Sequence, residues 1–145
     1  MLSERSRMKK GKGTHALLVL ACRKYQQVYE INPANFELLY NWGNVLLYRA
    51  KMEEDNPVLL KQAAQKYCEA LVLKPSSYNA LKNWGVALSK QARVKAPPKA
   101  WSLFTMAEQK FRECLLVLFH SLASLYTASF SLSLSLSLSL SLSLS

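Results

Sequence analysis

The chain has 145 residues, which is enough for one modest domain. Half of its residues are hydrophobic, and only four are glycine and five are proline, so the composition favours an all-α fold over a turn-rich β fold. Nineteen Lys and Arg oppose nine Asp and Glu. This net charge of +10 admits an acidic partner, but no Lys/Arg run interleaved with aromatics points to nucleic acid.

The N-terminal segment over residues 1–14 is predicted to be a basic, disordered arm. The apolar run "ALLVLAC" at 16–22 follows it, as in a signal peptide. This run is short and leads directly into a periodic segment, so we interpret it as part of a core helix over 15–31.

Good N-caps and helix-starting prolines divide the next part of the chain into four predicted helices. The breaks fall at Asn35, Asn56-Pro57, Ser77 and Pro97-Pro98. The helices are predicted over 36–52, 57–73, 78–94 and 99–118.

Two patterns recur along these helices. The first, Leu-x-Asn-Trp-Gly, begins at Leu39 and again at Leu81 and places Trp42-Gly43 and Trp84-Gly85 at the same point of two helices. The second joins a small residue, an aromatic residue, another small residue and a proline at spacings that share one helix face. Its members are Ala21, Tyr25 and Pro33, then Ala63, Tyr67, Ala70 and Pro75, then Ala107 and Phe111.

The two patterns resemble the tetratricopeptide repeat (TPR) family, in which the first helix of each hairpin carries the bulky and small residues and the second carries the aromatic phrase. The resemblance covers about residues 16–116. It implies a TPR-like helical-hairpin solenoid of about 2.5 repeats, in which glycine beside the large indole lets the second helix approach closely.

The repeats are longer than the family's usual 34 residues, because Tyr25 and Tyr67 are 42 residues apart and Tyr67 and Phe111 are 44 apart. Such hairpins are similar to those of plant and algal TPR scaffolds. The plant outer-membrane mitochondrial import receptor has a similarly stretched hairpin, although no motif specific to it is present. The first copy of the second pattern, from Ala21 to Pro33, has no first helix of a hairpin before it. We therefore expect the chain to be a fragment.

The resemblance also implies a partner-binding groove lined by the first helices. Asparagine can bond a peptide backbone, tyrosine gives rigid amphipathic area, and lysine attracts acidic groups. The predicted partner-binding residues are Tyr40, Asn41, Asn44, Tyr48, Lys82, Asn83, Val86 and Lys90. Alternatively, some of them only support packing between repeats. The clamp with which one TPR subclass binds heat-shock chaperones is incomplete here, since Tyr40 and Val86 replace a lysine and an asparagine.

The segment over 117–145 departs from the repeat pattern and ends in a Ser-Leu alternation. A CT dinucleotide tract encodes such an alternation, so we hypothesise a low-complexity tail that arose by read-through, from an intron or by a frameshift. Alternatively, residues 114–134 form an uncharged apolar stretch of spanning length that anchors the protein in a membrane.

The sequence contains no recognised catalytic, cofactor-binding or metal-binding arrangement. His15 and His120 stand alone, and the three cysteines lie far apart, which indicates a reducing, cytoplasmic setting. We therefore predict a non-enzymatic, cofactor-free TPR scaffold or adaptor that binds a protein partner, with a tail-anchored receptor or assembly factor as the alternative. Apolar ends without a capping helix predict self-association.

Overall fold

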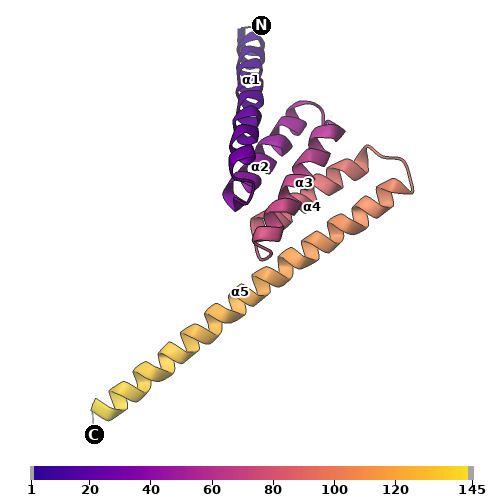
Figure 1. Cartoon of the computed structure of the whole chain (residues 1–145). Coiled ribbons are helices and arrows are strands. Elements are labelled where there is room, and N and C mark those ends of the chain that lie inside the picture. The colour runs from indigo at the N-terminus through magenta and orange to yellow at the C-terminus, as the bar shows by residue number, and fades with distance from the viewer. Residues whose placement is uncertain (1, 144–145) are drawn as a thin grey trace.

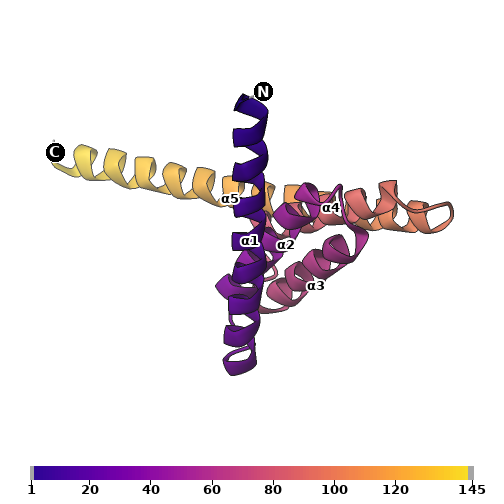
Figure 2. The same cartoon turned by 90° about the horizontal axis from the view of Figure 1, so that it is seen from above.

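Five helices form the chain in a computed structural model that describes residues 2–143 and the side chains of residues 11–140. They are α1 (Leu2–Ile31), α2 (Phe36–Met52), α3 (Pro57–Leu73), α4 (Tyr78–Arg93) and α5 (Lys99–Ser143), and no strand occurs within 2–143. Each helix packs against the next, and successive helices alternate in direction (Figures 1 and 2). The predicted all-α, helical-hairpin fold is confirmed.

The bounds of the three middle helices agree with prediction to within one residue, but the two outer helices are longer than expected. Helix α1 begins at Leu2 rather than near residue 15, so the prediction of a disordered arm over 1–14 is wrong for the described backbone. Gly11 and Gly13 weaken a helix there without ending it. Helix α5 continues to Ser143 instead of ending near 118, because neither glycine nor proline follows Pro98.

Capping side chains explain where the middle helices begin. Asn35 Oδ1 accepts from the Leu38 N–H at 3.0 Å, and Ser77 Oγ accepts from the Ala80 N–H at 3.4 Å. Asn56 Oδ1 accepts from the Val58 N–H at 3.0 Å, with Pro57 in the first helical position. Each bond satisfies a backbone donor that the helix itself leaves without a partner.

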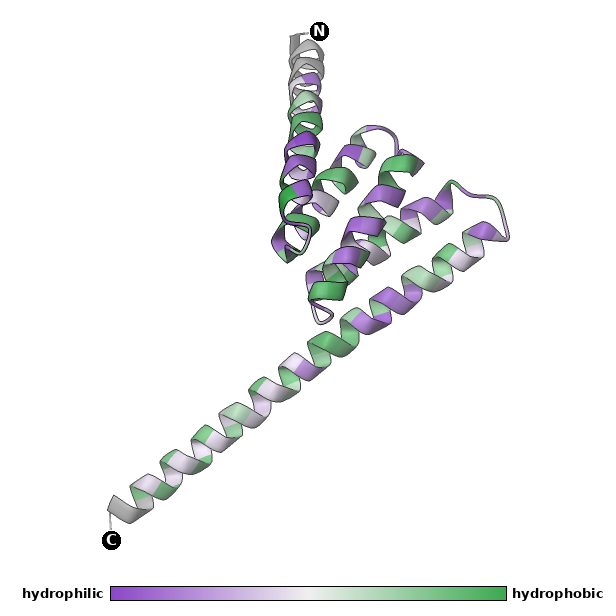
Figure 3. Cartoon of the chain, viewed as in Figure 1, coloured by the Kyte–Doolittle hydropathy of each residue, from purple (hydrophilic) through white to green (hydrophobic). Residues whose placement is uncertain are grey.

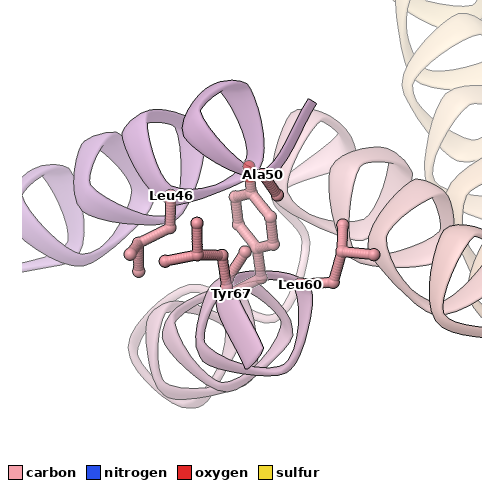
Figure 4. Close-up of a cluster of buried hydrophobic side chains, with 6 residues drawn as sticks. Leu46, Ala50, Leu60 and Tyr67 are labelled. Atoms are coloured by element: carbon pink, nitrogen blue, oxygen red, sulfur yellow. The ribbon is translucent and has the colours of Figure 1, made fainter. Parts of the chain in front are cut away.

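The main core lies between α2 and α3. Tyr67 and Leu60 of α3 are fully buried against Leu46 and Ala50 of α2 (Figure 4). A second cluster joins α3, α4 and α5 through Leu71, Leu81 and Cys114. Apolar residues of the outer helices remain exposed as expected, among them Leu17, Leu20, Leu115 and Leu116.

Each Trp-Gly glycine packs against the aromatic residue of the following helix. A Cβ atom on Gly43 would lie 2.7 Å from Tyr67 Cε1, and one on Gly85 would lie 2.8 Å from Phe111 Cε1. The two glycines therefore permit the second helix of each hairpin to approach closely, and the aromatic rings of Tyr67 and Phe111 occupy the space beside them.

An ion-pair network ties α1 to the α2–α3 turn and corrects the expectation that His15 stands alone. His15 Nε2 lies 2.7 Å from Glu53 Oε1, and Arg49 Nε donates to the same oxygen at 2.8 Å. Asn56 Nδ2 donates to Glu53 Oε2 at 3.0 Å. The hydrogen bond from His15 is the largest of several contacts that lower the pKa of Glu53 below its ordinary value.

Candidate functional site

A groove of about 380 Å³ lies between α2 and α4, on the side where the sequence predicted a binding surface. We call it the α2/α4 groove, and it is lined by Asn44, Leu47, Tyr48, Lys51, Val86 and Lys90. Four of the eight predicted partner-binding residues are among these. The structure thus brings Asn44 and Tyr48 of one hairpin beside Val86 and Lys90 of the next.

The polar centre of this region is a pair of asparagines that joins the repeats. Asn44 Oδ1 accepts from the Tyr67 hydroxyl at 2.8 Å and from Asn83 Nδ2 at 2.9 Å. Burial raises the pKa of Tyr67 well above its usual range, so its hydroxyl stays protonated and donates. Since both lone pairs of Asn44 Oδ1 are used, the amide nitrogen is the atom through which Asn44 can donate to a bound chain.

The other predicted residues have varied surroundings. Tyr40 is half-buried, with its ring centroid 5.9 Å from that of Phe36 and 6.3 Å from that of Tyr67, so it mainly supports the core. Asn83 is half-buried by its bond to Asn44. Asn41 and Lys82 are exposed, and Lys82 Nζ lies 5.6 Å from the Tyr78 ring centroid.

Two lysines border the groove, and one of them is neutralised. Lys90 Nζ lies 2.6 Å from Asp55 Oδ1, which belongs to the turn after α2. Leu47, Tyr48 and Val86 supply the apolar surface between the lysines. This arrangement suits an amphipathic segment that places apolar side chains in the groove, as in helix-in-groove recognition.

Sequence reasoning missed two residues that line the groove, Leu47 and Lys51.

Sequence reasoning also missed a further repeated motif. The motif Gln-Lys-aromatic-x-Glu occurs at 65–69 and 109–113. In both copies the lysine amine sits 2.8 Å from the glutamate carboxylate and 4.6 Å from the centroid of a signature tryptophan. The pairs are Lys66 with Glu69 and Trp42, and Lys110 with Glu113 and Trp84. These lysines stabilise the repeats, and their recurrence was visible in the sequence.

A second hollow, of about 480 Å³, lies on the opposite face of α2, between α1 and α3. Two of the three cations that line it are engaged within the protein, since Arg49 pairs with Glu53 and Lys66 pairs with Glu69, and the third, Arg23, is exposed. No group of three or more His, Cys, Asp or Glu that could hold a metal occurs in the part of the chain that the structure describes.

Helix α5 combines a packed segment with an exposed one. Ala100, Ala107 and Cys114 are buried at seven-residue intervals, which keeps them on one face of the helix. Every residue from Leu118 to Leu140 is exposed, and the helix projects away from the body (Figure 1). Over Lys99–Leu140 the helix is long and apolar enough to cross a membrane by length and composition.

Serine in the exposed segment does not create a polar face. Residues two apart are turned by about 200° in an α-helix, so alternating Ser and Leu surround the axis. Figure 3 shows green and pale positions mixed along this part of α5. Each Ser hydroxyl from Ser129 to Ser139 donates to the carbonyl three residues earlier at 2.8–2.9 Å. The hydroxyls therefore have partners that do not depend on water.

Comparison with known families matches the chain to a family model. The model of the "Plant specific mitochondrial import receptor subunit TOM20" family matches residues 16–133, which is more than half of the chain and includes the first part of the exposed segment. No curated protein matches the chain.

Proposed function

Since the chain belongs to the plant TOM20 mitochondrial import receptor family, we propose that it is a membrane-anchored receptor that holds a protein partner in the α2/α4 groove. The observation that carries the proposal is the continuity of α5. One helix is packed in the last hairpin and continues as an exposed, uncharged apolar segment.

The segment over 118–140 has the properties that a spanning helix needs. A helix of about 20 residues crosses a hydrocarbon core of about 30 Å, and this segment, in which leucine alternates with serine over its last part, is longer than that. Its titratable residues are His120 and Tyr126, and its serine hydroxyls donate to backbone carbonyls. The absence of a polar face favours a spanning helix over one that lies in the interface.

A receptor for mitochondrial import must bind the proteins that are imported, and their targeting segments are amphipathic and poor in acidic residues. The apolar side chains of such a segment fit Leu47, Tyr48 and Val86. The ion pair between Lys90 and Asp55 removes one charge that would repel a basic segment. The scaffold or adaptor that the sequence favoured has less support than the anchored receptor, and the family match does not support the cytoplasm as the main location.

Anchoring is tested with a point substitution in the full chain. Leu125→Lys places a charge in the middle of the segment, which costs roughly 2.5–3.5 kcal/mol in membrane insertion. Trp101→Lys is the matched control, because both side chains are 68% exposed on α5 and Trp101 lies outside the segment. We expect Leu125→Lys to release the chain from membranes at alkaline pH while Trp101→Lys stays bound. Release of the unaltered chain would refute anchoring.

Groove binding is tested with Tyr48→Ala, which removes exposed aromatic area. We expect a loss of about tenfold in affinity for an amphipathic targeting peptide, corresponding to about 1.4 kcal/mol. Val58→Ser is the control, because Val58 is exposed on α3 outside the groove. Equal affinities for both variants, measured by fluorescence anisotropy, would remove the groove from the proposal.

A further inference from the structure

The way α5 leaves the body determines which end of the body faces a bilayer. Helix α5 runs without interruption from Lys99 to Ser143, and Cys114 is still buried in the last hairpin just before the exposed segment begins. An uninterrupted helix does not provide the flexibility of a linker. If α5 is the anchor, which rests on the proposed function, the end of the body beside the exit of α5 lies at the membrane.

That end is formed by the C-terminal ends of α1 and α3 and by the α3–α4 turn. Figure 1 shows the turn beside α5 at the point where the helix leaves the body, with the end of α1 on the same side. Pro75 and Ser76 of the turn line one hollow together with Leu116 and Val117 of α5. The opposite end, with the α2–α3 turn, is directed away from the exposed segment.

Large apolar side chains are exposed at this end. Ile31 is 85% exposed and Val72 is 77% exposed, the highest values for large apolar residues among the described side chains. Leu73 is exposed next to Val72. An apolar hollow of about 280 Å³ lies between the two helix ends, lined by Tyr29, Pro33, Ala34, Leu39, Glu69, Val72 and Leu73. We call Ile31, Val72 and Leu73 the membrane-proximal rim.

We propose that the membrane-proximal rim contacts the lipid surface from which α5 emerges. The headgroup layers add roughly 10–15 Å to a hydrocarbon core of about 30 Å, so each layer is deep enough to take side chains beside the entry point of a helix. Contact with lipid removes Ile31 and Val72 from water, and the exposed Lys74 next to the rim can approach lipid phosphates. The rim and α5 then hold the body in one orientation.

The test uses the full chain in vesicles made only of phosphatidylcholine and phosphatidylethanolamine. An environment-sensitive fluorophore is attached to Ile31→Cys or Val72→Cys in a Cys22→Ser/Cys68→Ser background, since Cys114 is buried. Val58→Cys is the matched control, because Val58 is also an exposed valine but lies at the start of α3, at the opposite end. Circular dichroism equal to that of the unaltered chain shows that each variant is folded.

We expect blue-shifted emission and quenching by brominated lipid at positions 31 and 72, and neither effect at position 58. Emission typical of water at all three positions, from a chain that resists alkaline extraction, overturns lipid contact and leaves the anchor intact. Shielding of positions 31 and 72 only in native outer membranes means that a membrane protein covers the rim, and this also overturns the proposal. A chain that alkali extracts from the vesicles refutes the anchor and lipid contact together.

Discussion

Substitution of Gly43 by alanine tests the packing of the two helices of a hairpin. The added Cβ atom would lie 2.7 Å from Tyr67 Cε1, 2.9 Å from Cδ1 and 3.0 Å from Cζ. Carbon atoms prefer separations of about 3.5–4.0 Å, so the ring or the helix must move by about 1 Å. Tyr67 cannot easily give way, because it is fully buried and its hydroxyl is bonded to Asn44.

The expected loss of stability combines two opposing effects. Overpacking a core costs about 1–3 kcal/mol, and the fixed ring places this site in the upper half of that range. Replacing glycine with alanine inside a helix contributes about 1 kcal/mol in the other direction. The net destabilisation is therefore about 1–2 kcal/mol, which lowers the Tm of a domain of this size by roughly 5–15 °C.

The assay is a thermal melt followed by circular dichroism, with the full chain in a mild detergent. Gly13→Ala is the control, because Gly13 lies within α1 and a Cβ atom there would meet nothing within 4 Å, so this variant should be slightly stabilised. Gly85→Ala should cost less than Gly43→Ala, because Phe111 is 36% exposed and has no hydroxyl to hold it. A Gly43→Ala chain as stable as Gly13→Ala would refute the close packing.

Three further predictions concern a buried hydrogen bond, a titrating carboxylate and the salt dependence of peptide binding. Asn44→Ala should cost about 1–3 kcal/mol by leaving the buried Tyr67 hydroxyl without its acceptor, whereas Asn41→Ala should change the unfolding free energy by less than about 0.5 kcal/mol. The folded pKa of Glu53 is lowered, so its contribution to stability is present above its ordinary pKa of 4.5 and is lost as pH falls through the folded value; Glu53→Gln, but not Glu54→Gln, should flatten acid unfolding there. Peptide binding through apolar contacts should change little with salt, while a steep loss of affinity on adding salt would indicate that ion pairs between peptide and protein dominate instead.

Helix positions could be predicted from the sequence because each boundary has a local chemical cause. Asn35, Asn56 and Ser77 accept the hydrogen bonds expected of N-caps, and Pro57 begins α3. The extent of α5 was missed because the Ser-Leu alternation departs from the repeat pattern and was interpreted as a low-complexity tail. In a helix the same residues surround the axis, and the hydroxyls bond to the preceding turn.

The groove could be predicted only in part, because helical spacing does not show how one helix is rotated against its neighbour. The rotation of α2 decides which of its residues near Trp42 face the core and which face the groove. Tyr40 packs on Phe36 and Tyr67, while Leu47 and Lys51 line the groove instead. The resemblance to the repeat family did imply a groove lined by the first helices, and the structure brings Asn44 and Tyr48 beside Val86 and Lys90 in one.

The position of the α2/α4 groove relative to the membrane-proximal rim determines how far from a bilayer the groove would open. Helices α2 and α4 begin near the exit of α5, and the groove is lined by residues of their middle and later turns, such as Tyr48, Lys51 and Lys90. If the membrane-proximal rim rests on lipid, the groove therefore opens farther from the bilayer than the rim does. A partner arriving from the aqueous side then meets the groove before it meets the membrane. Gly85 contributes to this arrangement because its contact with Phe111 affects how α5 lies on α4, and hence the direction in which the exposed segment of α5 leaves the body.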